Sequence, residues 1–333
     1  MTDLITLEAI KSRHAELAGL VPHTPTVRLC SDAVARALNS DDIFLKLESL
    51  QRTGTFKARG ALSNISVMDK AARARGITAA SAGNHAIAAA WAAKVAGVSA
   101  KVVMQDTANP YRIALAQAQG AQVILKPPGA ATFAEAERLV AEEGRTFLHP
   151  FEGLNTSLGT AGVGLEFIKD VPDLDAVVIA CGGGGLLSGV AAAVKLSNPA
   201  CKVYGVEPKG ADSMSRSLKA GKPVTLQATD TLADSLAPPM ALPFGFALCQ
   251  QFVDDIVTVT DDQICAGQVI LQQEAKQAVE PAAGAAMAGA LGPLRARLSG
   301  RRIGVLVCGA NIDAASYAAQ LQRGLPHVAS LLA

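Results

Sequence analysis

The sequence predicts an α/β fold built on mainly parallel sheets. Short apolar segments bounded by turn residues alternate with longer segments in which apolar residues recur at helical spacing. Half of the 333 residues are hydrophobic but only 4% are aromatic, so small aliphatic side chains supply most of the core. Such a composition suits helices that pack closely on both faces of a buried sheet.

The strands are expected in short apolar runs flanked by turns. Helical segments between residues 57 and 143 are about 10 to 15 residues long, which is the length of crossover helices that join parallel strands. The predicted strands are residues 43–47, 77–80, 101–104, 122–125, 176–180, 202–206, 256–259 and 303–307.

Charge and hydropathy exclude two classes of partner. Lys and Arg total 30 against 29 for Asp and Glu, so we expect no nucleic-acid binding. The apolar runs are shorter than the roughly 20 residues that a membrane span needs, so no membrane association is expected. Residues 1–4 show none of the features of a signal peptide, and the cytoplasm is the expected location.

Cysteines and histidines are dispersed along the chain. There is no C-x-x-C pair and no H-E-x-x-H motif. The spacing therefore argues against a disulfide framework, a redox pair or a metal centre built from these residues.

The clearest local motif is the run Gly182, Gly183, Gly184 and Gly185, followed by Leu186. It comes directly after an apolar strand and before an Ala/Val-rich helix. Glycines let the backbone approach an anion closely, and the N-terminus of a helix presents free N–H groups and a positive dipole end. The motif predicts a phosphate site.

The kind of phosphate stays open at this motif. A dinucleotide fingerprint needs G-x-G-x-x-G, and Leu187 and Ser188 stand where the third glycine would be. Glu207 nevertheless ends the next strand, where an acid that binds a ribose would lie. A nicotinamide-dependent oxidoreductase is therefore an alternative.

A second motif, S-L-Q-R-T-G-T-F-K-A-R-G-A at residues 49–61, places Lys57 at the start of a helix. The positive end of the helix dipole would lower the pKa of this lysine and favour a nucleophilic amine. A solvated surface lysine is the alternative reading.

A third motif, S-A-G-N-H, lies between a predicted strand and an alanine-rich helix. Ser81, Asn84 and His85 offer short polar groups beside free backbone N–H groups, which suits a carboxylate or a phenolic oxygen. An ordinary helix N-cap is the alternative.

Together with V-C-G-A-N at residues 307–311, these motifs resemble, in order and spacing, the fold type II pyridoxal-phosphate enzymes. The likeness is greatest to the serine/threonine dehydratases and spans residues 23–311. The resemblance implies a large domain (1–50 plus 150–333), a small domain (51–149), the cofactor between them, and a homo-oligomer, either a dimer or a tetramer.

The resemblance also implies the roles of individual residues. Lys57 would hold pyridoxal 5'-phosphate as a Schiff base, and the glycine loop from Gly182 to Leu186 would bind its phosphate. Cys308 would face the pyridine nitrogen, and a thiol is a weak donor that leaves this nitrogen unprotonated. Of the remaining residues, Phe56 would flank the ring, Asn84 would bond its hydroxyl, and the substrate would lie against Ser81, Ala82, Asn84 and His85.

The implied reaction is β-elimination from an L-3-hydroxy amino acid, which gives a 2-oxo acid and ammonia. Serine racemases carry a second base, a serine, at the position of Ala82, so racemisation is not expected. Serine racemase-like and hydroxyaspartate dehydratase activities remain alternatives, as does a protein that binds a small molecule without turnover.

The cation site of many relatives is incomplete in this sequence. Glu207 and Ala211 match two of its ligands, but Ser213 replaces an acid. We therefore expect no strict requirement for a divalent metal.

The substrate's side chain is expected to be apolar. Residues 129–133 carry no arginine that would pair with a β-carboxylate. Phe133, the 233–239 loop and Phe244 are predicted to line an apolar pocket. L-threo-3-phenylserine is thus a competitor to threonine and serine as the substrate.

Overall fold

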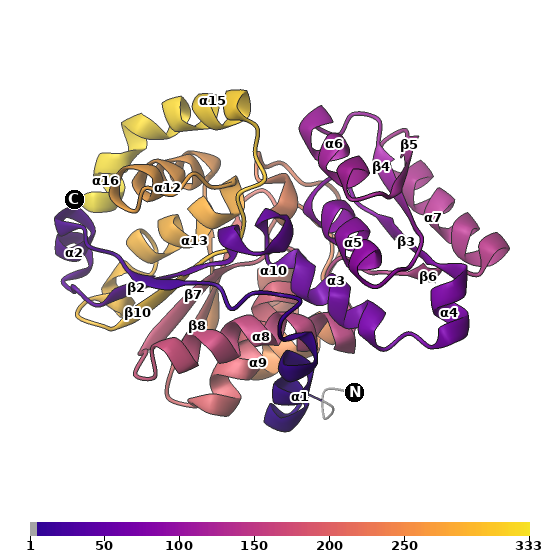
Figure 1. Ribbon diagram of the computed structural model, residues 1–333. Helices are drawn as coiled ribbons and strands as arrows, with labels where there is room; N and C mark the ends of the chain where they lie inside the picture. The colour runs from indigo at the N-terminus through magenta and orange to yellow at the C-terminus, as the bar shows by residue number, and fades with distance from the viewer. Residues whose placement is uncertain (1–4) are drawn as a thin grey trace.

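Two separate sheets organise the computed structural model, which describes residues 5–333 (Figure 1). The larger sheet has six strands in the order β1-β2-β10-β7-β8-β9, and the smaller has four in the order β5-β4-β3-β6. Among the strand pairs of residues 5–333, only β1–β2 is antiparallel. The predicted α/β class with two mainly parallel sheets is therefore confirmed. Residues 1–4, which bear on the predicted absence of a signal peptide, lie outside the described residues.

All of the predicted strands are present, with small changes at their ends. Two short strands were not predicted, β1 and β6, because they hold three and two partly exposed residues and carry no apolar pattern. The strands are β1 (Thr26–Arg28), β2 (Ile43–Leu47), β3 (Ile77–Ala80), β4 (Ala100–Gln105), β5 (Gln122–Lys126), β6 (Thr146–Phe147), β7 (Ala176–Ala180), β8 (Lys202–Pro208), β9 (Asp255–Val259) and β10 (Ile303–Val307).

Helices cover both faces of the large sheet and flank the small one. In the small half, α4 and α6 have six and nine residues, which corrects the predicted length of 10 to 15. The first helices are α1 (Leu7–Leu17), α2 (Asp32–Leu38), α3 (Lys57–Ser66), α4 (Lys70–Arg75), α5 (Asn84–Val95), α6 (Pro110–Ala118), α7 (Ala130–Glu143) and α8 (Leu154–Asp170). The others are α9 (Gly185–Ser197), α10 (Ser213–Ala220), α11 (Pro243–Phe252), α12 (Asp261–Glu274), α13 (Pro281–Leu291), α14 (Arg295–Leu298), α15 (Ala314–Gly324) and α16 (Val328–Leu332).

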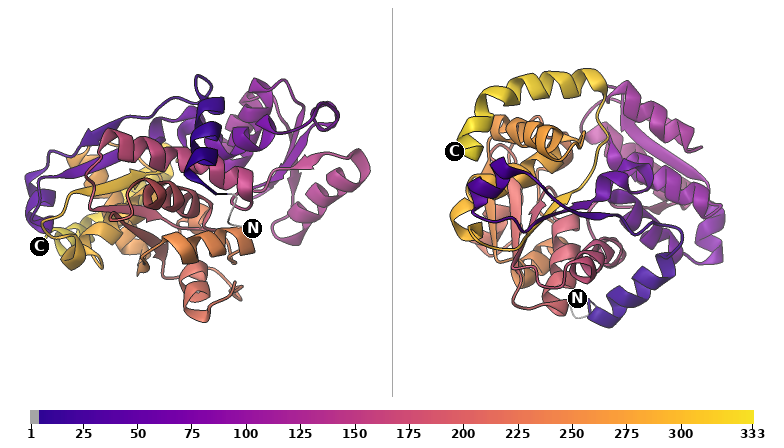
Figure 2. Two further views of the ribbon diagram at one scale, coloured as in Figure 1. Left: turned by 90° about the horizontal axis from the view of Figure 1, so that it is seen from below. Right: turned by 60° about the vertical axis from the view of Figure 1, so that its left-hand side comes forward.

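The two sheets occupy opposite ends of the molecule. In both views of Figure 2, the magenta helix α7 of the small half lies at one end and the C-terminal helix α16 at the other. The small sheet and the helices around it come from residues 57–147, inside the predicted small domain, whose boundaries stay a prediction. Among residues 5–333, we find no helix with the length and apolar character needed to cross a bilayer.

Glycines let the helices α8 and α9 pack closely in the large half. A Cβ on Gly164 would lie 2.7 Å from the carbonyl oxygen of Val190, and one on Gly189 would lie 2.6 Å from that of Ser157. These helices therefore touch backbone to backbone. The close packing determines where the N-terminus of α9, and with it the glycine loop, is placed.

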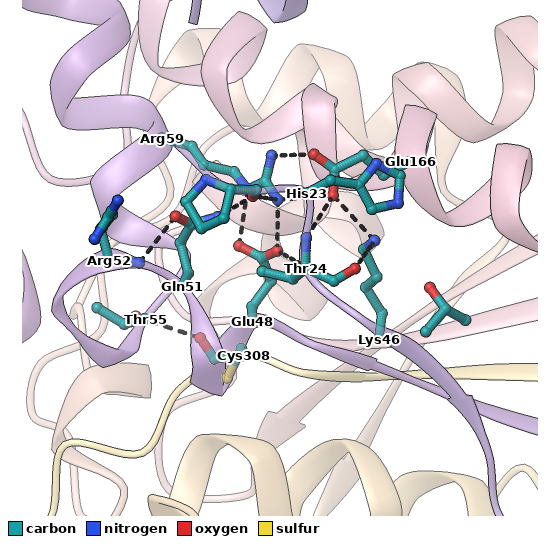
Figure 3. Close-up of polar contacts among 12 residues, drawn as sticks. His23, Thr24, Lys46, Glu48, Gln51, Arg52, Thr55, Arg59, Glu166 and Cys308 are labelled. Carbon is teal, nitrogen blue, oxygen red and sulfur yellow. Dashed lines mark hydrogen bonds and ion pairs between the residues drawn. The ribbon is translucent and has the colours of Figure 1, made fainter. Parts of the chain in front are cut away.

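A buried ion-pair network connects α3 with two segments of the large half, the residues that follow β2 and helix α8 (Figure 3). The Arg59 guanidinium donates to both carboxylate oxygens of Glu48 at 2.9 and 2.8 Å and to both of Glu166 at 2.7 and 2.8 Å. Lys46 Nζ lies 3.0 Å from Glu166, and Thr24 donates to Glu48 at 2.6 Å. These three charged partners and Arg59 are at most 1% exposed. Arg59 lies two residues after Lys57, so the network holds the start of α3.

We expect Arg59→Leu to destabilise the protein strongly. The substitution leaves the carboxylates of Glu48 and Glu166 buried with too few cations, and loss of one partner from such a network costs about 3 to 5 kcal/mol. Urea unfolding followed by circular dichroism measures this loss. Arg138→Leu is the matched control, because Arg138 forms its ion pairs with Glu135 and Glu142 on the surface of α7. Equal unfolding midpoints for the two variants would contradict the prediction.

Candidate functional site

The turn before α3 brings Lys57 to the end of strand β10. Thr53 and Gly54 both have positive φ angles, 64° and 70°, which reverse the chain there. The Thr55 hydroxyl and the Phe56 N–H then donate to the carbonyl oxygen of Cys308 at 3.3 and 3.2 Å. Lys57 thus begins its helix beside the carboxyl end of a central strand, where α/β sheets commonly place their ligands.

The Lys57 side chain is half-buried, and its ammonium is removed from water. Nζ donates to the carbonyl oxygen of Pro150 at 2.5 Å and lies 5.0 Å from the centre of the Phe56 ring. Burial lowers the pKa of Lys57 to about 8, against the opposing effects of Glu280 and Cys308. The sequence analysis expected a lowered pKa from the helix dipole, but loss of hydration is the largest cause.

The glycine loop connects β7 with α9 and packs against Phe151. Gly184 has a φ of +88°, and a Cβ on Gly183 would lie 2.4 Å from the Phe151 ring. The N–H groups in the first turn of α9 have no acceptor within the helix and are available to an anion. A small internal cavity borders Gly185 and the lysine together, and its lining includes Phe56, Lys57, His85, His149, Pro150 and Gly185.

The S-A-G-N-H segment opens helix α5 beside this cavity. Asn84 Nδ2 donates to both carboxylate oxygens of Glu280 at 3.0 and 2.8 Å, and its Oδ1 accepts from Asn311 Nδ2 at 2.8 Å. Ser81 Oγ accepts the Gly83 N–H at 3.2 Å. Asn84 is therefore not the helix cap of the alternative reading, because Gly83 holds the N-cap position and the Asn84 side chain connects α5 to the large half.

Both histidines that border the cavity are neutral. Burial lowers the pKa of His85 to about 3 and that of His149 to about 4, and the Lys57 charge lowers both further. The imidazole of His85 also shares a 2.8 Å hydrogen bond with the Leu148 carbonyl. Neither imidazole therefore offers a positive charge near neutral pH.

Cys308 lies at the end of β10 and is 1% exposed. Burial raises the pKa of its thiol well above the usual value, and the Glu280 carboxylate adds to this effect. Cys308 is therefore a neutral thiol, consistent with the weak donor that the sequence analysis expected.

Two groups of predicted residues lie elsewhere. Phe133 is 54% exposed on α7 and does not border the cavity, so its role in substrate binding stays a prediction. The Glu207 carboxylate accepts the N–H groups of Met214 and Ser215 at 2.9 and 2.8 Å, which caps α10. Ser213 turns its hydroxyl to the Pro238 carbonyl at 3.5 Å.

The expectation that the enzyme has no strict requirement for a divalent metal stays a prediction. Across residues 5–333, His, Cys, Asp and Glu side chains form no group of three or more that would hold an ion. Ala211, which matches another position of the relatives' cation site, is buried two residues before the start of α10. Burial raises the pKa of Glu207 to about 8, which weakens it further as a cation ligand.

Sequence reasoning missed two charged residues at the site. Glu280 is 1% exposed, and the only local signal at it is Pro281, which marks a helix start and says nothing about Asn84. Arg112 on α6 pairs with Asp234 and donates from Nε and Nη2 to the Asn311 carbonyl at 3.2 and 3.1 Å. Its Nη1 lies 3.0 Å from where a Cβ on Gly83 would be.

The comparisons with known proteins agree with this geometry. Residues 18–309 match the family described as "Pyridoxal-phosphate dependent enzyme". The chain belongs to this family. The cofactor of the enzyme is accordingly pyridoxal 5'-phosphate, and the resemblance drawn from the motifs is confirmed.

Relatives within the family carry names of lyases and racemases. A phenylserine dehydratase of Ralstonia pickettii is 45% identical over 97% of this chain and 98% of its own. An L-threonine ammonia-lyase of Thermotoga maritima is 36% identical over 97% of this chain and 79% of its own. The solved structure of maize serine racemase aligns with a TM-score of 0.89 and 31% identity, over 97% of this chain and 98% of the other. The enzyme is thus a member of the dehydratase branch of its family.

We expect the reactivity of Lys57 in the cofactor-free enzyme to have a midpoint near pH 8. A lysine acts as a nucleophile only when deprotonated, and burial lowers the pKa of Lys57 to about 8 from the ordinary 10.5. Acetylation of the apoenzyme at a series of pH values, followed by peptide mass spectrometry, measures the midpoint. The acetylated peptide that is missing from the Lys57→Arg variant is the one that contains Lys57. A midpoint above pH 10 would contradict the burial described here.

Proposed function

We propose that this enzyme dehydrates an L-3-hydroxy amino acid with an aryl or other apolar β-substituent, and that Lys57 is its cofactor lysine. The observation that carries the proposal is one cavity that joins a desolvated lysine to the glycine loop. The products are a 2-oxo acid and ammonia. The 45% identity to a phenylserine dehydratase supports the choice of substrate class.

The residues present fit pyridoxal phosphate. The first turn of α9 offers the phosphate N–H groups that have no acceptor in the helix, and glycines 182–185 let the loop pack tightly against Phe151, Met214 and Leu236. Asn84 would lie toward the ring hydroxyl, Phe56 beside the ring, and Cys308 toward the pyridine nitrogen. When bound, the cofactor acts as an electron sink that weakens the bond between the α-carbon and its hydrogen.

The side chains of the site supply binding and proton transfer. Lys57 Nζ, with a pKa of about 8, gains and loses a proton near neutral pH and carries the proton of the α-carbon. The first-turn N–H groups of α5, next to Ser81 and Ala82, hold the substrate carboxylate. His85 and His149 stay neutral, so they leave Lys57 as the base of the site.

The ion pair of Arg112 and Asp234 favours a substrate with an uncharged β-substituent. Arg112 is the cation beside the S-A-G-N-H segment, and its charge is neutralised by Asp234. A second substrate carboxylate would have to displace Asp234, which argues against hydroxyaspartate. The 233–239 loop packs directly on the glycine loop, because a Cβ on Gly182 would lie 3.0 Å from Leu236 Cα.

Two further expectations complete the proposal. Ala82 has no group that could act as a base, so elimination is expected to exceed racemisation even though maize serine racemase shares the fold. A homo-oligomer, either a dimer or a tetramer, in the cytoplasm is expected from the resemblance to fold type II enzymes.

The substrate preference is tested by steady-state kinetics of the holoenzyme. We expect kcat/KM for L-threo-3-phenylserine to exceed the values for L-threonine and L-serine by at least about tenfold, because burying an aryl group contributes more than about 1.4 kcal/mol. Formation of the 2-oxo acid and ammonia is the readout, with D-serine followed in parallel. Lys57→Ala is expected to abolish turnover. A preference for threonine would contradict the aryl assignment, and turnover by Lys57→Ala would contradict the cofactor lysine.

We expect Asp234→Asn to raise activity on L-threo-3-hydroxyaspartate relative to phenylserine by about tenfold or more. The variant frees the Arg112 guanidinium, and a charge-assisted bond to a second carboxylate is then worth about 1.5 to 3 kcal/mol. The ratio of the two kcat/KM values is the measurement. Asp313→Asn is the matched control, because Asp313 bonds Asn109 of the same helix without touching Arg112. An unchanged ratio in Asp234→Asn would contradict the role of the pair.

A further inference from the structure

The strongest unused feature of the site is a one-directional chain of hydrogen bonds that ends on Glu280. Asn311 Nδ2 donates to the Thr53 carbonyl and to Asn84 Oδ1, both at 2.8 Å. Asn84 Nδ2 then donates to both oxygens of Glu280. Asn311 donates to the amide oxygen of Asn84 and Glu280 accepts from its amide nitrogen, so both ends of the Asn84 amide are fixed in orientation.

Glu280 is buried where the large half meets the small half, and Asn84 of the small half donates to it. It occupies the N-cap position of α13 without a side-chain capping bond, and its backbone N–H donates to the Gly309 carbonyl at 3.2 Å. A Cβ on Gly309 would lie 2.6 Å from Glu280 Oε1 and 3.2 Å from Thr55 Oγ1. The carboxylate therefore lies close to the turn that delivers Lys57, in space that only a glycine leaves open.

Several charged or titratable groups face this carboxylate and the lysine. Lys57 on α3 and Arg112 on α6 attract the Glu280 charge, Asp234 on the 233–239 loop repels it, and the Cys308 thiol lies on the β10 side. His85 and His149 face Lys57 from α5 and from the loop before α8. Burial raises the pKa of Glu280 to about 7, and the Glu280 charge in turn opposes the lowering of the Lys57 pKa.

We propose that Glu280 is a positioning residue with two effects on the cofactor site. Its hydrogen bonds hold the Asn84 amide in its orientation, and its negative charge stabilises the Lys57 ammonium. The proposal rests on the assignment of Lys57 as the cofactor lysine. Glu280 itself touches neither substrate nor cofactor in this role, and it acts through Asn84 and Lys57.

The test measures the rate at which the apoenzyme recombines with pyridoxal phosphate as a function of pH. Only deprotonated Lys57 reacts, so the midpoint of the rate profile follows its protonation. Glu280→Gln keeps the shape of the side chain and removes the charge, so we expect the midpoint to fall by about one unit. An unchanged midpoint in a folded Glu280→Gln protein would overturn the charge effect.

Glu280→Asp is the matched variant, because it keeps the charge and shortens the reach to Asn84. We expect its midpoint to stay near that of the unmodified enzyme, while its dissociation constant for pyridoxal phosphate rises several-fold. Circular dichroism and thermal unfolding of each apoenzyme show whether it is folded. If Glu280→Gln does not fold, Glu280→Asp still decides the hydrogen-bond effect, and an unchanged dissociation constant would overturn it.

The two proposals fail in different ways. Borohydride reduction of the unmodified holoenzyme, followed by peptide mapping, places the cofactor on Lys57 without any reference to Glu280. A label on another lysine would refute the cofactor lysine. A label on Lys57 together with unchanged behaviour of both Glu280 variants would refute the inference alone.

Discussion

The position of Lys57 depends on one buried arginine. Arg59 forms two-pronged hydrogen bonds with Glu48 and Glu166, which come from the end of β2 and from α8. A buried charge is stable only when oppositely charged groups surround it. The network therefore fixes how α3, the end of β2 and α8 pack against one another. Because Arg59 and Lys57 share the first turns of α3, the network that satisfies the arginine also places the lysine at the end of β10.

The chemical character of the lysine follows from that place. Burial favours the neutral amine, whereas Glu280 favours the ammonium, and the net result is a pKa of about 8 because the cost of desolvation is the larger effect. The same burial keeps His85, His149 and Cys308 neutral. Lys57 and Glu280, with pKa values of about 8 and about 7, are the groups of the site that change charge near neutral pH.

Small residues bring the rest of the site to this lysine. Glycines in α8 and α9 allow the two helices to touch through their backbones, and those in the 182–185 loop accept the Phe151 ring. A larger residue at Gly164 or Gly189 would separate α9 from α8 and move the glycine loop away from Lys57. Arg112 and Asp234 form an ion pair beside Gly83 of the S-A-G-N-H segment, where the Asp234 charge neutralises that of Arg112.

The sequence by itself determined the β-α alternation, the central strands, the glycine loop and the lysine at a helix start. These are local patterns, and apolar periodicity and turn residues report them directly. The edge strands β1 and β6 were not predicted because they are short and partly exposed. Only the tertiary structure decided that Asn84 meets Glu280, 196 residues away in sequence, and that Phe133 lies on the surface. Such contacts depend on how the two halves pack, and no local pattern encodes the partner of a buried charge.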